Sequence, residues 1–130
     1  MLPYFQKDFL IIYYDEVNRI VVSKWEIPPA SQEFRNGMDV LIEALIHFNT
    51  GKVIFDTVYL GALLDSDQTW ISRNWYERAV RAGYSQVAFV IPQEVFTQMF
   101  VIEAVNQTIN RIPTAYFHNM KEAIDWINLV

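Results

Sequence analysis

The stretch Lys52-Val-Ile-Phe-Asp-Thr-Val58 decides the fold that this sequence predicts. It holds three consecutive apolar residues, which is typical of a β-strand that is covered on both faces. A second run of this kind, Gln86-Val-Ala-Phe-Val-Ile-Pro92, follows after a helical pattern that extends from about Gln68 to Ala82. Two buried strands that are joined through a helix run parallel in one sheet. The sequence therefore predicts an α/β fold with a mostly parallel core.

Two further strands and a helix are predicted ahead of this core. Phe9–Tyr14 and Arg19–Trp25 are rich in β-branched and aromatic residues, and only four residues separate them. A parallel pair would need a longer crossover, so we expect an antiparallel pair. A pair of prolines ends the second strand, and Ser31 is expected to cap a helix whose apolar stripe runs from Phe34 to Phe48.

Glycines and cap-forming residues mark the ends of the predicted helices. Gly37, in the middle of the first helix, indicates a close approach to a neighbouring element. Gly51 is expected to end that helix in the left-handed conformation, and Gly83 to end the next one. The cluster Asp65-Ser-Asp67 is expected to lie just ahead of the Gln68–Ala82 helix as its cap.

The C-terminal part of the sequence continues the alternation of predicted strands and helices. After Pro92 a helix is predicted with Val95, Met99, Ile102, Val105 and Ile109 on one stripe, and Thr114–His118 reads as a fifth strand. Asn119, with Glu122 three residues later, predicts the start of a last helix over Met120–Leu129. The predicted order is β-β-α-β-α-β-α-β-α. This describes one domain, residues 1–130, with a five-stranded sheet whose first strand is antiparallel and whose faces are covered by helices.

The composition excludes several classes of protein and of functional site. It has 130 residues and no cysteine, which excludes disulfides, thiolate metal sites and a cysteine nucleophile. Its net charge of -5 disfavours nucleic-acid binding. No apolar run approaches the ~20 residues of a membrane helix, and the first residues do not match a secretory signal. We therefore expect a cytoplasmic protein that neither spans a membrane nor binds nucleic acid.

Few residues are candidates for a ligand-binding, metal or catalytic site. Ligands of open α/β sheets bind at the carboxyl ends of the strands, which places Asp56 and Thr57 at the predicted edge. These two residues either form a ligand site or bond to backbone N–H groups of a turn. His47 and His118 lack a second ligand at metal spacing, and no zinc, nucleotide or serine-hydrolase motif occurs. We predict no catalytic residue, no metal and no cofactor.

Aromatic residues on the Gln68–Ala82 helix suggest an interface. Trp70, Trp75 and Tyr76 spread over more than half of a helical wheel, so at least one should be partly exposed. They either cover neighbouring loops or form a hot spot for self-association. We expect a homodimer, formed through this helix or through Phe9–Tyr14 as an edge strand.

Several stretches make this sequence similar to the SpoIIAA-like superfamily, which includes STAS domains and small bacterial STAS/SEC14-like proteins. The resemblance covers nearly the whole chain, and its landmarks are Phe55–Gly61, Asp67–Ile71, Asn74-Trp75, Ala82-Gly83, Ala88–Pro92, Tyr116-Phe117 and Ala123–Trp126. In anti-sigma-factor antagonists of this superfamily, a serine or threonine after the third strand is phosphorylated by a partner kinase. Asp56 and Thr57 match the first two positions of that motif, so the resemblance implies that Thr57 is phosphoacceptor-like.

Two functions of different classes follow. The first is a non-enzymatic regulatory or protein-interaction module of the STAS type, with a protein partner and a phosphorylation switch. The alternative is a carrier of a small apolar ligand or lipid, which the aromatic content of 15% suggests. A closed pocket lined by Trp, Phe and Met would favour the carrier, and a filled sheet end would favour the module.

Overall fold

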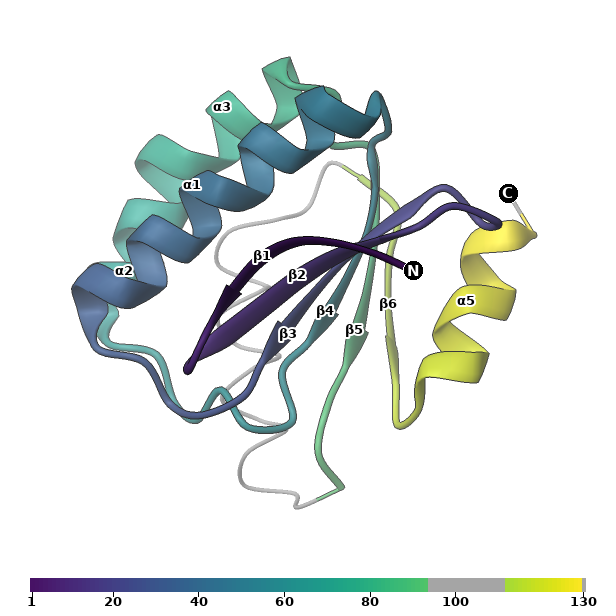
Figure 1. The fold of residues 1–130 in the computed structure, drawn as a ribbon. Coiled ribbons are helices and arrows are strands. Elements are labelled where there is room, and N and C mark those ends of the chain that lie inside the picture. Colours follow the sequence, from purple (N-terminus) through teal and green to yellow (C-terminus); the bar gives the residue numbers. More distant parts are fainter. Residues whose placement is uncertain (94–111, 130) are drawn as a thin grey trace.

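A computed structural model describes residues 1–93 and 112–129, and these form a six-stranded mixed sheet with helices on both faces (Figure 1). The α/β class that the sequence predicts is confirmed. The strands are β1 (Leu2–Lys7), β2 (Leu10–Asp15), β3 (Ile20–Trp25), β4 (Lys52–Asp56), β5 (Gln86–Val90) and β6 (Thr114–Phe117). The helices are α1 (Ser31–Phe48), α2 (Asp65–Trp70), the π-helical turn η1 (Ile71–Trp75), α3 (Tyr76–Arg81) and α5 (Met120–Asn128).

The strands lie in the sheet in the order in which they follow along the chain. β1 pairs with β2 and β2 with β3, both antiparallel, whereas β3, β4, β5 and β6 are parallel. The predicted antiparallel pair and the predicted parallel core are therefore both confirmed. Within the described ranges, no helix has the length and apolar character needed to cross a membrane.

The prediction of five strands is wrong, because Leu2–Lys7 adds a sixth at the edge of the sheet. This segment gives a weak strand signal, since it contains Pro3 and its register with β2 shifts between Pro3 and Phe5. Proline and irregular register are features of edge strands. β1 also corrects the expectation that Phe9–Tyr14 forms an edge strand, because β2 has β1 on one side and β3 on the other.

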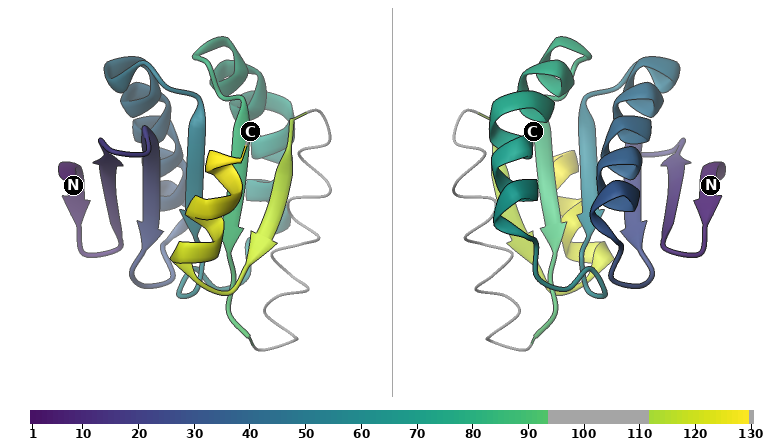
Figure 2. Two further views of the ribbon diagram at one scale, coloured as in Figure 1. Left: turned by 90° about the vertical axis from the view of Figure 1, so that its right-hand side faces the viewer. Right: turned by 90° about the vertical axis from the view of Figure 1, so that its left-hand side faces the viewer.

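Helices form one layer on each face of the sheet (Figure 2). α1 and the α2–η1–α3 helix cover one face, where Trp25, Leu41 and Trp75 belong to the larger apolar core. α5 covers the other face, where Ile127 packs with Ile54 and neighbouring apolar residues. The helix predicted after Pro92, with Val95, Met99, Ile102, Val105 and Ile109, lies outside the described residues.

The predicted details of α1 are partly confirmed. A Cβ atom on Gly37 would lie 2.5 Å from Leu10 Cδ2 and 2.9 Å from Trp25 Cη2, so glycine permits the close approach that was predicted. The N-cap is Ala30 and not Ser31, and the Ala30 N–H donates to the Glu33 carboxylate. Asn49, with φ of 52°, takes the left-handed position that was assigned to Gly51. Gly51 is instead required because a Cβ there would collide with the Gly83 carbonyl oxygen.

The ends of the next two helices also test the predictions. Leu64 is the N-cap of α2, so Asp65, Ser66 and Asp67 lie inside the first turn and not ahead of it. Gly83 follows α3 with φ of 111°, which confirms its predicted role at the helix end. The Asn119 side chain accepts a hydrogen bond from the Glu122 N–H, as the sequence predicts for the start of α5.

Candidate functional site

Three exposed apolar side chains lie on the loops that follow β3 and β4, at the carboxyl edge of the sheet. Ile27 is 51% exposed, Tyr59 58% and Leu64 59%, and these three residues are named here the carboxyl-edge surface. The two loops run side by side (Figure 1), since a Cβ on Gly61 would lie 3.6 Å from the Pro28 side chain. Exposed apolar residues on adjacent loops make this edge a candidate for a binding surface.

The loop that carries Tyr59 and Leu64 is held in place along its length. The Thr57 N–H donates to the Val90 carbonyl at 2.9 Å, and the Leu60 N–H donates to the Thr57 carbonyl at 3.2 Å. Leu60 is only 5% exposed and anchors the loop in the core. Near the other end, the Gln68 side chain donates to the Leu63 carbonyl. The apolar residues beside these anchors are therefore presented on a fixed backbone.

Thr57 is part of this anchoring. Thr57 is 3% exposed, and its hydroxyl donates to the Val90 carbonyl at 3.0 Å. A kinase needs an accessible hydroxyl, so the burial contradicts an accessible phosphoacceptor at Thr57 and corrects that prediction. The alternative that the sequence left open, bonds to backbone N–H groups of a turn, is observed for Asp56, which accepts from the Val58 N–H, but not for Thr57, whose hydroxyl donates to the Val90 carbonyl of β5.

Asp56 ends β4 as a nearly buried carboxylate. The residue is 9% exposed, and its Oδ1 accepts a hydrogen bond of 3.2 Å from the Val58 N–H. Burial raises the pKa of Asp56, while the Val58 hydrogen bond and the positive charge of Lys24 lower it and the negative charge of Glu26 raises it further. Lys24 faces Asp56 in the strand register, yet its ammonium group pairs with Glu26 at 4.0 Å. Among the described residues, Asp56 forms no ion pair.

Tyr13 shares the electrostatic environment of Asp56. Burial raises the pKa of the Tyr13 hydroxyl, and the negative charges of Asp56 and Asp15 raise it further. In the strand register, Tyr13 pairs with Val22, which in turn pairs with Ile54 on β4. Because side chains alternate along a strand, Asp56 lies on the same face of the sheet as Ile54, which is the face that α5 covers.

A second polar group joins α1 to α2 next to the carboxyl-edge surface. Asp67 is 3% exposed and accepts hydrogen bonds from the Ser31 hydroxyl at 2.7 Å and from Arg35 Nε at 2.8 Å. Arg35 also donates to the Ser66 carbonyl. This group, which we call the α1–α2 joint, fixes the far ends of both loops. Sequence reasoning missed it, because Asp67 looks like an ordinary helix-cap residue and its partners lie more than 30 positions away.

The three predicted interface aromatics occupy different environments. Trp75 and Tyr76 are each 1% exposed, and the Trp75 indole N–H donates to the Met38 carbonyl of α1 at 2.7 Å. Both therefore belong to the interior of this chain, which corrects their assignment as interface candidates. Trp70 is partly exposed, as expected for one of the three, and the guanidinium groups of Arg35 and Arg78 lie 5.3 and 5.8 Å from its ring.

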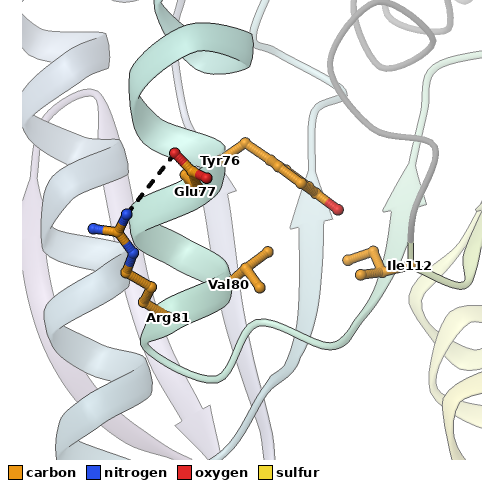
Figure 3. Close-up of a pocket in the computed structure, with 5 residues that line it drawn as sticks. All are labelled: Tyr76, Glu77, Val80, Arg81 and Ile112. Carbon is orange, nitrogen blue, oxygen red and sulfur yellow. Dashed lines mark ion pairs between the residues drawn. The ribbon is translucent and has the colours of Figure 1, made fainter.

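A cavity of about 300 Å³ lies beside α3 (Figure 3). Its lining is mixed in character, and one wall carries the ion pair between Arg81 and Glu77; the lining residues are Tyr76, Glu77, Val80, Arg81 and Ile112. It does not have the Trp, Phe and Met lining that was expected of a pocket for an apolar ligand. This cavity therefore gives the carrier hypothesis little support.

The groups at the carboxyl edge are suited to binding. Apolar side chains on fixed loops provide contact area, whereas the Asp56 carboxylate is nearly buried and forms no ion pair among the described residues. No group of three His, Cys, Asp or Glu side chains within residues 1–93 and 112–129 has the arrangement to hold a metal ion. Comparisons with protein-family models, with curated proteins and with solved structures found no match for this chain.

Proposed function

We propose that this chain is a non-enzymatic protein-interaction module of the STAS type, and that it binds a protein partner through its carboxyl-edge surface. The observation that carries the proposal is that Ile27, Tyr59 and Leu64, each more than half exposed, lie on two adjacent anchored loops. Protein interfaces are centred on such apolar and aromatic groups. Membership of the SpoIIAA-like superfamily is part of this proposal and is supported by the sequence landmarks given above.

The position of Leu64 gives further support. Leu64 is the N-cap of α2 and makes no side-chain hydrogen bond to the helix. Leucine is among the least favoured residues at an N-cap, and a serine or aspartate there typically adds about 1 kcal/mol to helix stability. The chain thus carries an exposed apolar group where a polar one would stabilise the fold. Such a loss of stability is common where a residue serves function.

The anchoring of the loops also favours binding. Association loses free energy when side chains and loops become ordered, by about 0.5–1.5 kcal/mol for each flexible side chain. The hydrogen bonds of Thr57 and Leu60 fix the backbone before any partner arrives. The backbone of this surface therefore loses little conformational freedom when a partner binds.

The carrier hypothesis has weaker support. The aromatic rings that suggested it stack on one another inside the chain, with centroids 5.3 Å apart for Phe55 and Phe89 and 5.4 Å for Trp25 and Phe34. All four rings belong to the larger apolar core, so their number is explained by packing. Self-association and a cytoplasmic location both stay predictions, and of the three aromatic residues predicted for a dimer interface on the Gln68–Ala82 helix only Trp70 is partly exposed.

The test is site-specific photo-crosslinking in cells that produce the protein. Tyr59 is replaced by benzoylphenylalanine, and irradiation is expected to give a discrete adduct with one partner protein. Val17, which is 90% exposed in the turn between β2 and β3 at the opposite edge of the sheet, is the matched control position. We expect no such adduct from position 17.

Two outcomes contradict the proposal. The first is the absence of an adduct from position 59, or the same set of adducts from both positions. The second is an adduct made only of two copies of this chain, identified by its mass, which would assign the surface to self-association and not to another protein.

A further inference from the structure

β1 leaves one side of its backbone open at the edge of the sheet. It pairs with β2 on its inner side, and among the described residues no strand lies on its outer side (Figure 2). The backbone N–H and C=O groups of an edge strand can pair with a strand of another chain. The groups that β1 points outward therefore decide whether a second chain can extend the sheet.

One hydrogen bond fixes the direction of the backbone groups in β2. The Glu26 N–H donates to the Phe9 carbonyl, and the antiparallel register of β2 with β3 continues from this pair. Successive residues of an antiparallel strand point their backbone groups to alternate sides. Every second residue from Phe9 onward therefore bonds toward β3. The residues between them point their backbone groups toward β1, and these are Leu10, Ile12 and Tyr14.

The register of β1 with β2 then gives the direction of the paired residues in β1. Leu2, Phe5 and Lys7 are the partners of the three β2 residues that face β1, so their own backbone groups face β2. Pro3 and Gln6 are the partners of residues that face β3, so their backbone groups point outward. Proline has no N–H group to donate. Among the paired residues of β1, Gln6 alone therefore offers an N–H on the outer side.

A second copy of this chain would meet this defect directly. Two β1 strands that pair antiparallel are related by a twofold axis, which is the commonest symmetry of protein dimers. In the register that overlaps the whole of both strands, Pro3 of each copy lies opposite Gln6 of the other. Each proline leaves the Gln6 carbonyl opposite it without a donor, and its ring occupies the place of the missing hydrogen bond.

β2 is the strand that this arrangement protects. Leu10–Tyr14 consists only of leucine, isoleucine and tyrosine, without charge, proline or glycine. Short segments of this kind associate readily when their backbone groups are open to another chain. β1 covers the side of β2 on which Leu10, Ile12 and Tyr14 present these groups, and its own outer side lacks the donor at Pro3.

We infer that β1 closes the edge of the sheet against strand addition, and that Pro3 prevents a second copy of this chain from pairing there. The predicted homodimer would accordingly use a different surface. The inference does not depend on the proposed binding surface, which lies on the loops after β3 and β4.

The test compares amide hydrogen exchange in the full chain and in Pro3→Thr. Threonine supplies the missing N–H and favours β-strands. In the unaltered chain, the Gln6 amide should exchange nearly as fast as in an unfolded chain, while the Phe5 and Lys7 amides are protected. In Pro3→Thr, the Gln6 amide should become protected as the protein concentration rises. We expect the dissociation constant of this contact to fall by about tenfold or more, which corresponds to about 1.4 kcal/mol from the restored hydrogen bonds.

A double variant is the matched control. Adding Gln6→Pro to Pro3→Thr moves the missing donor to the other outward position and leaves the backbone groups that face β2 in place. Its self-association in sedimentation experiments should return to the level of the unaltered chain. Amide signals of β3, β4 and β5 should be the same in all three proteins, which checks that the fold is intact.

Three results would overturn the inference. Protection of the Gln6 amide in the unaltered chain would show that the edge is paired despite Pro3, or that this amide faces β2. A Gln6 amide that stays unprotected in Pro3→Thr up to about 1 mM, where contacts of about -4 kcal/mol are already half formed, would show that Pro3 does not limit pairing. A double variant that associates as strongly as Pro3→Thr would place the new contact on another surface.

Discussion

The α1–α2 joint and the carboxyl edge are neighbours, but the aspartate in each has a different set of hydrogen-bond partners. Asp67 in the joint is 3% exposed and is bound by the Ser31 hydroxyl and the Arg35 guanidinium. Asp56 at the carboxyl edge is 9% exposed and has one backbone N–H as its hydrogen-bond donor in the described part of the chain. The chain thus compensates a buried charge where the fold depends on it. At the other site the carboxylate has no such compensation among the described residues.

Apolar residues show the same contrast. Trp75 packs between the sheet and α1 and is 1% exposed, whereas Leu64 is 59% exposed. Burying a leucine side chain completely contributes about 1.5–3 kcal/mol to stability. The exposed residues of the carboxyl-edge surface therefore contribute less to the stability of the fold than buried residues of the same type would. Substitutions beside α1 should therefore reduce stability, and substitutions at the carboxyl edge should reduce binding.

The largest effect is expected from Trp75→Ala. This change removes a buried ring and the hydrogen bond to the Met38 carbonyl, so the free energy of unfolding should fall by about 3–5 kcal/mol in denaturant titrations. Trp75→Phe removes the indole N–H and only part of the ring, and it should lower stability by a smaller amount. A loss below about 1 kcal/mol for Trp75→Ala would contradict the packing described here.

Asp67→Ala should have the next largest effect. It leaves the Ser31 hydroxyl and the Arg35 guanidinium without their acceptor, and we expect a loss of about 2 kcal/mol, below that of a fully buried pair because Arg35 reaches solvent. Asp65→Ala, in the same helical turn but exposed, is the control and should stay within about 0.5 kcal/mol of the unaltered chain. Equal losses in the two variants would remove the distinction between the joint and its surroundings.

The smallest effect on stability is expected from Asp56→Asn, and it has the opposite sign. Burial raises the pKa of Asp56, so the folded chain holds this proton at a higher pH than the unfolded chain does. Its contribution to stability is therefore largest at low pH and falls as pH rises through the raised pKa. Asp56→Asn should raise the unfolding free energy at pH 7 by on the order of 0.5 kcal/mol.

The same gain should disappear when the carboxyl group is protonated in both states, below its ordinary pKa of about 3.9. Denaturant titrations at several pH values measure this dependence. Lower stability of Asp56→Asn at neutral pH would mean that the charge serves the fold.

Much of the fold is predictable from the sequence, because buried strands and amphipathic helices have strong periodic patterns. The run at Val53–Phe55 and the stripe from Phe34 to Phe48 both lie where the pattern indicates. β1 has no such pattern, since Pro3 interrupts it and its apolar residues Tyr4 and Phe5 are only partly buried. The π-helical turn at Ile71–Trp75 was also missed, because an extra residue in a turn leaves the local pattern nearly unchanged.

The candidate site was harder to predict, because it depends on contacts between distant parts of the chain. The sequence placed Asp56 and Thr57 at the carboxyl edge, but only the structure shows that Thr57 is buried while Tyr59 is exposed. Local sequence also cannot distinguish Asp67 from Asp65. Both suit the start of a helix, and only Asp67 meets Arg35.

The most direct test measures stability and binding together in one variant, Leu64→Ser. Serine is a favoured N-cap, so this account predicts that the unfolding free energy rises by about 1 kcal/mol while the photo-crosslink from position 59 is lost. An adduct that persists at its original yield would show that Leu64 is not part of a binding surface. A fall in stability that accompanies loss of the adduct would show that Leu64 serves the fold, and would contradict the central claim.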